Sequence, residues 1–199
     1  MRKIKKVKIK IKIKIVKKPD ICIGDHFIYK DIKWICLDVI DGNYLAITAK
    51  VWQELPFDFG NHNNWKESSL RRMLNYKFLD KLNKEHLVIQ TSDLIADNGD
   101  KSYGTCEDYV TILSCDQYRR YRDIIPQCSD KWVWSLTPWN CFSGTDLVRI
   151  VYPANWFNSF YFADRNIGVA PVVLFSSEIL KSLMYLKTKP IRKVVADET

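Results

Sequence analysis

The three histidines and the acids near them are the first places where this sequence could do chemistry. His26 stands at the start of a β-branched run, His62 lies in a polar stretch, and His86 follows a run with helical spacing. None has a nucleophile or carboxylate partner at a recognised catalytic spacing. Asp58 and His62 could ligate a metal ion, yet isolated loop residues of this kind are far more often solvated. The sequence therefore predicts no metal site.

Thiol chemistry is the second possibility, because the chain has six cysteines: Cys22, Cys36, Cys106, Cys115, Cys128 and Cys141. No CxxC or paired-histidine spacing occurs, which disfavours zinc. We expect free thiols, with Cys22 and Cys36 the pair to examine first for a bridge. The GxGxxG, GxxxxGK[ST], GxSxG and HExxH motifs are absent as well. These absences favour binding over catalysis, and we expect no cofactor.

Segment 139–166 has an unusual composition, in which large aromatic residues alternate with Asn, Ser, Asp and Arg. This mixture is typical of recognition surfaces, where aromatics and Arg supply contact area and Asn and Ser supply adaptable hydrogen bonds. A buried β-rich half is the alternative interpretation. The predicted ligand-binding residues are Asn140, Phe142, Ser143, Asp146, Asn155, Phe157, Asn158, Phe160, Tyr161, Asp164, Arg165 and Asn166.

The positive charge of the chain is concentrated at its start. Residues 1–18 hold ten Lys and Arg and no acid, so the formal net charge of +8 leaves about −2 for residues 19–199. A nucleic-acid-binding face is therefore not expected on the remainder. Within 7–15, Val and Ile alternate with Lys, which predicts a β-strand with one apolar and one charged face. Its lysines could blunt a sheet edge or bind a polyanion, and its apolar face could pack on the same domain or on a second copy.

Other patterns predict an α+β fold of antiparallel strands and two main helices. A meander over 24–49 is expected from three apolar runs separated by Lys30-Asp31 and Asp41-Gly42. Residues 53–64 have the composition of a loop. An Asn64–Glu67 capping box is expected to open a helix over 68–82. The inner face of this helix would carry Leu70, Met73, Leu74 and Phe78. A second helix begins at the Ser114–Gln117 box and continues to about Ile124. Further strands are expected at 131–137, 147–151, 157–162 and 169–175, and a last helix at 176–186. No signal peptide or transmembrane segment is predicted.

Several stretches resemble a bacterial and phage family of domains of uncharacterised function with a C-type-lectin-like fold. The most specific is 65–78, which is similar to the family motif W-x-x-S-S-L-R-x-x-L-N-x-x-F. Gly24-Asp25, 34–39, Asp41-Gly42, 112–114, 132–134 and 168–171 follow in the family's order, so that the resemblance covers about 22–175. It implies a single lectin-like domain over 19–199, which follows the lysine-rich arm at 1–18.

Two departures point to one branch of that family. Ser135-Leu136-Thr137-Pro138 and Ala170-Pro171 replace the usual Leu-Arg-Ser-Pro and Arg-Pro-Ala. These variants resemble proteins diversified by retroelements, such as the phage major tropism determinant, whose residues between these motifs form the ligand-binding face. Adenine mutagenesis there cannot produce Lys, Glu, Gln, Met or Trp. Segment 140–166 has no Lys, Glu, Gln or Met, and its Trp156 is expected to be fixed scaffold.

The resemblance thus implies a binding protein for a protein or surface-glycan ligand, without catalysis. Calcium-lectin signatures of the Glu-Pro-Asn type are absent from the sequence, so no calcium dependence is expected. A homo-oligomer through the N-terminal strand is a further possibility, and the chain could act at a virion or cell surface. One alternative is a structural or assembly module of a phage or cell surface that is not diversified. A second is a formylglycine-generating-type oxidase, which needs two copper-binding cysteines, for which only Cys141 and Cys128 are suitably placed.

Overall fold

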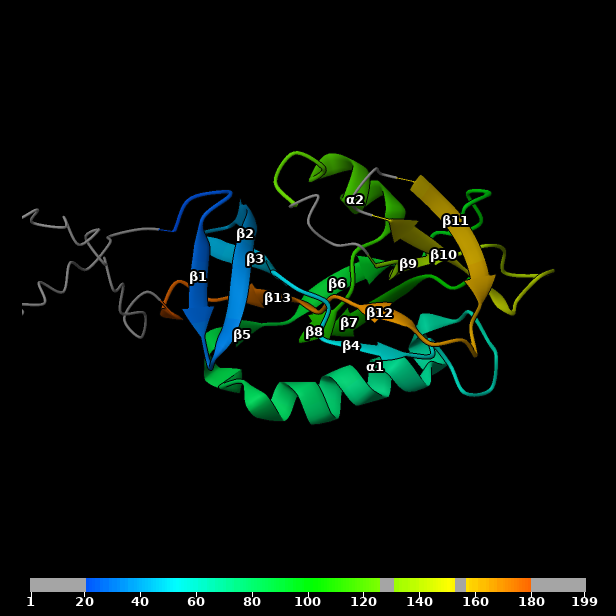
Figure 1. Ribbon diagram of the computed structural model, residues 1–199, viewed down its shortest axis with the longest axis horizontal. Helices are drawn as coiled ribbons and strands as arrows, with labels where there is room; N and C mark the ends of the chain where they lie inside the picture. Colours follow the sequence, from blue (N-terminus) through cyan, green and yellow to red (C-terminus); the bar gives the residue numbers. More distant parts are fainter. Residues whose placement is uncertain (1–20, 126–130, 153–156, 180–199) are drawn as a thin grey trace, which may run out of the picture.

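The structure is a computed structural model that describes residues 21–125, 131–152 and 157–179. It is a mixed α+β fold built mostly of antiparallel sheets, as expected (Figure 1). The predicted strand at 7–15, Asn155, Trp156, Cys128 and most of the predicted last helix lie outside the described residues. No helix of the described part is long and apolar enough to cross a membrane.

The first sheet contains the predicted meander. Its strands are β1 (His26–Tyr29), β2 (Ile32–Ile40), β3 (Asn43–Thr48), β13 (Val172–Phe175) and β5 (Leu87–Val88), in that order, and β8 (Val110–Thr111) also pairs with β13. Asp41 and Gly42 form the turn between β2 and β3 with φ values of 49° and 77°. Positive φ at both central residues matches the twist of the flanking strands, which is why Asp-Gly predicts a hairpin here.

The second sheet positions the candidate binding segment. Its order is β11 (Phe157–Phe162), β10 (Leu147–Tyr152), β9 (Val133–Pro138), β12 (Ile167–Val169) and β4 (Gln53–Leu55). Two expectations were wrong here. The single strand predicted at 169–175 is two strands in different sheets, because Pro171, which lacks an N–H, separates β12 from β13. Short strand β4 lies inside the predicted loop 53–64 and pairs with β12.

A third sheet of two strands, β6 (Gln90–Asp93) and β7 (Thr105–Asp108), was not predicted. The helical segments are η1 (Trp65–Glu67), α1 (Ser69–Met73), the π-helical η2 (Leu74–Phe78), η3 (Leu79–Lys81), η4 (Lys84–His86) and α2 (Cys115–Arg120). The run from α1 to η3 fills most of the predicted helix over 68–82. The Asn64–Glu67 capping box was wrong, because Asn64 caps η1 by accepting from Lys66 N, and Ser68 caps α1.

The second helix has the predicted capping box, in which Ser114 and Gln117 bond to each other's backbone. However, α2 ends at Arg120, and residues 121–124 form turns instead of continuing the helix to Ile124. The two main helices of the prediction are thus one composite helical run and one short helix.

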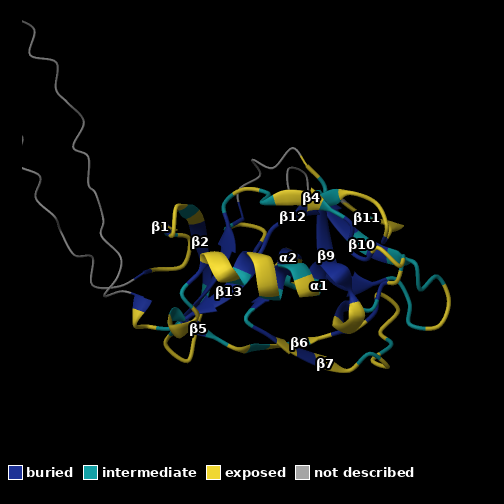
Figure 2. Cartoon of the chain, turned by 90° about the horizontal axis from the view of Figure 1, so that it is seen from below, coloured by how far each residue is buried: buried dark blue, intermediate teal, exposed yellow. Residues whose placement is uncertain are grey.

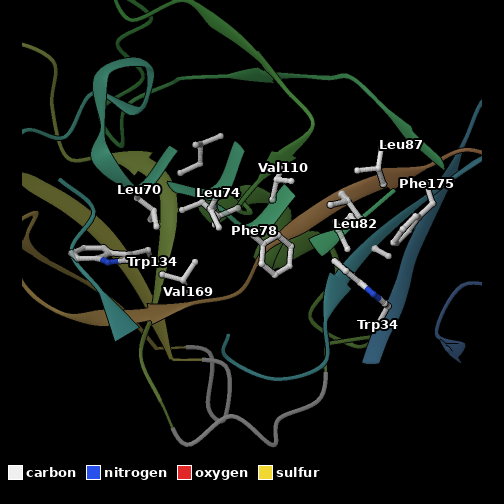
Figure 3. Packing of buried hydrophobic residues seen from close by; sticks show 14 of the residues in the cluster. Trp34, Leu70, Leu74, Phe78, Leu82, Leu87, Val110, Trp134, Val169 and Phe175 are labelled. Atoms are coloured by element: carbon white, nitrogen blue, oxygen red, sulfur yellow. The ribbon is translucent and has the colours of Figure 1, made fainter. Parts of the chain in front are cut away.

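The hydrophobic core lies between the helical run and the two larger sheets (Figure 3). Leu70, Leu74 and Phe78 are buried, as predicted, whereas Met73 is only half-buried because it turns toward an open groove beside Tyr76. Trp34 packs edge-to-face on Phe175 from the first sheet. Figure 2, viewed from below Figure 1, shows exposed and buried residues alternating along the helical run, as expected for an amphipathic helix on a sheet.

Candidate functional site

The W-x-x-S-S-L-R motif is part of the scaffold. Trp65 donates from Nε1 to Oδ2 of Asp108 at 2.9 Å, and Arg71 donates from Nε to Oδ1 of the same carboxylate at 2.8 Å. Asp108 lies on β7 and its side chain is only 2% exposed. Ser68 Oγ accepts from Arg71 N at the start of α1. Trp65 and Arg71 therefore hold the helical run to the third sheet, and Ser68 caps α1.

Asp58 and His62 are the only metal-ligand pair that the sequence suggested, and the Asp58 carboxylate is instead engaged in hydrogen bonds that stabilise the loop. Asp58 Oδ1 accepts from Ser69 N, and Oδ2 accepts from Gly60 N, both at 2.9 Å. His62 Nδ1 lies 3.4 Å from Oδ2. Burial raises the pKa of Asp58, but the hydrogen bonds from Ser69, His62 and Gly60 together bring it below its ordinary value. Among the described residues, no three His, Cys, Asp or Glu side chains are grouped to hold a metal ion.

The cysteines of the described residues are all free thiols, Cys22 and Cys36 included. Burial raises the pKa of Cys36 and of Cys106 to about 11, so both stay protonated at neutral pH. Burial and the nearby Asp100 carboxylate raise the pKa of Cys141 as well. Protonated thiols are weak nucleophiles and weak metal ligands.

The loop residues predicted for binding lie together. Loop 139–146 joins β9 to β10, and turn 163–166 follows β11. Ala163 N donates to Asp146 O at 2.8 Å, which places the two segments side by side. Phe142 is 80% exposed, and Ser143, Asp164, Arg165 and Asn166 are also exposed, whereas Asn140 and Asp146 are half-buried.

The strand residues predicted for binding are divided between the two faces of β11. Phe160 is opposite Arg149 in the pairing of β10 with β11, and Tyr161 is opposite Val148. Because successive strand residues point to opposite faces, Asn158 and Phe160 share one face while Tyr161 lies on the other. β11 is the edge of its sheet, so Phe160 and Tyr161 are both exposed, by 43% and 45%. The side chain of Phe157 lies outside the described part.

Trp139 is a site residue that the sequence reasoning missed. Its ring lies 4.7 Å from the Phe160 ring, centroid to centroid, and the Arg149 guanidinium carbon lies 4.7 Å from the centroid of the same Trp139 ring. Arg149 in turn pairs with Asp97 from the loop after β6. Trp139 was not among the predicted binding residues, and Trp is a residue type that adenine mutagenesis cannot produce. Its place at the boundary of segment 139–166 was the available signal.

We name these groups together the β11 surface: Trp139, Phe142, Ser143, Asn158, Phe160, Tyr161, Phe162, Asp164, Arg165 and Asn166. A polar cleft of about 330 Å³ lies nearby, between β6, α2 and β9, and its lining includes Asp93, Asp97 and Asp116. Arg149 and Arg119 pair with the last two carboxylates. The arrangement offers stacking and hydrogen bonding at the surface, rather than a reactive group with a base.

Comparison of the chain with protein-family models, with curated proteins and with solved structures gives no match.

Proposed function

We propose that this chain is a ligand-binding protein without catalytic activity, which displays the β11 surface on a C-type-lectin-like scaffold. The observation that carries the proposal is the exposure of four aromatic side chains on loop 139–146 and the edge strand β11: Phe142, Phe160, Tyr161 and Phe162, with Tyr161 on the opposite face of β11 from Phe160. Exposed aromatic patches bordered by polar groups are usually contact surfaces, because the rings gain more on binding than isolated apolar residues do. The ligand class is a protein or a surface glycan.

The composition of the segment supports a more specific form of the proposal, in which retroelement-directed mutation diversifies the β11 surface. The resemblance of 22–175 to such proteins suggests it, and the absence of Lys, Glu, Gln and Met from 140–166 is consistent with it. In this form the surface carries no inherited specificity, and different copies of the gene bind different ligands.

Alanine substitution of Tyr161 and of Arg165 tests the binding function. Both side chains are exposed, so each substitution is expected to change the free energy of unfolding by less than about 0.5 kcal/mol. Because Tyr and Arg are enriched among hot spots, each is expected to weaken binding by about tenfold or more. The measurement is labelling of a glycan array and of a panel of intact bacterial cells by the fluorescent full chain.

Tyr76→Ala is the matched control, since Tyr76 is 69% exposed and belongs to η2 of the helical run, outside the β11 surface. It should leave labelling unchanged. Labelling that survives both Tyr161→Ala and Arg165→Ala would contradict the proposed surface. Absence of labelling on every array and cell would contradict the binding function and favour the structural-module alternative.

A further inference from the structure

Asn63 holds the loop of the β11 surface from inside the protein. It is 0% exposed and belongs to the segment before the helical run. Its Nδ2 donates to Asn140 O and to Leu147 O, both at 2.9 Å, and to Gly144 O at 3.3 Å. Its main-chain N–H donates to Thr145 O at 2.7 Å. The side chain is fixed by Tyr103, whose hydroxyl donates to Asn63 Oδ1 at 2.8 Å.

The same short segment also holds the second part of the surface. Asn61 Oδ1 accepts from Asp164 N at 3.2 Å, and Asp58 N donates to Ala163 O at 3.0 Å. Asp58 is itself fixed to the start of α1 through Ser69 N. The contacts of 58–63 thus connect both loops of the β11 surface to the helical run and its core.

On the loop side, every one of these contacts is made by a main-chain carbonyl or N–H. Such groups are present whatever side chain a position carries, so the contacts do not depend on the residues displayed. At two loop positions, however, the residue type itself matters for the loop conformation. Asn140 Oδ1 accepts from Phe142 N at 2.8 Å, and Gly144 has a φ of +62°, where an added Cβ would also lie 3.1 Å from Trp139 Cδ1. Asn140 is therefore constrained by its side-chain hydrogen bond, and Gly144 by its positive φ.

We propose that residues 58–63 form a clamp, which holds both loops by their main-chain groups and so fixes the loop shape independently of the exposed side chains. Asn63 is the positioning residue of this clamp. The five side chains at Phe142, Ser143, Asp164, Arg165 and Asn166 are then exchangeable without change of the loop backbone. This inference rests on the proposed binding function, in which one scaffold presents many different surfaces.

Amide hydrogen exchange, measured by mass spectrometry on the full chain, tests the clamp without any ligand. In Asn63→Asp, a carboxylate oxygen replaces the donor Nδ2, so all three carbonyls lose the Asn63 side-chain bond while the acceptor for Tyr103 remains. Leu147 O and Gly144 O keep their main-chain donors Trp139 N and Leu147 N, and the carboxylate faces all three carbonyls as a repelling acceptor. Exchange over 139–147 should rise by about tenfold or more, because lost hydrogen bonds favour local opening. Exchange in α1 and β13 should stay unchanged.

Asn75→Asp is the matched control, since Asn75 Nδ2 also donates to a main-chain carbonyl, Val110 O at 2.8 Å, in a half-buried bridge away from the loops. It should raise exchange near 105–111 and leave 139–147 as in the unmodified chain. Unchanged exchange over 139–147 in Asn63→Asp would overturn the clamp.

A second variant keeps the clamp testable if Asn63→Asp does not fold. It carries Phe142→Ser, Ser143→Ala, Asp164→Asn, Arg165→Ser and Asn166→Ser together. Its exchange over 139–147 and 163–164 should match that of the unmodified chain, and a marked rise would contradict the clamp. Neither variant's result depends on a ligand, so failure of the clamp and failure of the binding function are separate outcomes.

Discussion

Replacing Leu74 with alanine is expected to lower the free energy of unfolding by about 2–5 kcal/mol, as for other large-to-small core substitutions. Leu74 is 0% exposed, on η2, in the cluster that joins the helical run to both larger sheets. Its removal leaves a cavity in a close-packed cluster that can relax only in part. Urea denaturation monitored by Trp fluorescence measures the change.

Tyr76→Ala is a control from the same helical run, because Tyr76 is 69% exposed. It should change the free energy of unfolding by about 0.5 kcal/mol or less. Equal effects of the two substitutions would show that the run does not bury its Leu74 face against the sheets.

Replacing Asp108 with alanine is expected to cost about 3 kcal/mol of the free energy of unfolding. The substitution leaves the indole N–H of Trp65 buried without an acceptor and the Arg71 guanidinium without its carboxylate. Arg71 keeps its contacts to the carbonyls of Lys66 and Glu107, which limits the loss. The same denaturation experiment measures it.

Asp108→Asn separates the two partners. An amide oxygen can still accept from Trp65, so about half of the loss should be restored. An alanine variant as stable as the unmodified chain would contradict the scaffold role of the W-x-x-S-S-L-R motif.

Local signals made much of the fold predictable. Asp41-Gly42 defines one hairpin, and the aromatic-rich run predicted as a strand at 157–162 has the limits of β11. The strands missed between 87 and 111 have two to four residues each, too few to show alternation. Their pairing is set by tertiary contacts, such as that of β8 with β13.

The sequence predicts which segment contains the candidate site, but not which of its side chains lie on the same face. Aromatic and polar residue types mark segment 139–166 without reference to the fold. Which residues share a face depends on the edge position of β11, and that follows from the pairing of distant strands. Asn63 could not be found from the sequence, because its partner Leu147 lies 84 residues away and one buried Asn has no local pattern.

Sequencing of the gene and its flanks, in many cells or particles that carry it, tests the diversified binding surface most directly. The expected result is amino-acid variation confined to 140–166 and strongest at exposed positions such as Phe142 and Arg165, with Asn63, Asp108 and Trp156 constant. A reverse-transcriptase gene and a near-duplicate of the segment should lie close by. Variation spread evenly along the chain, with neither element nearby, would contradict the diversified surface.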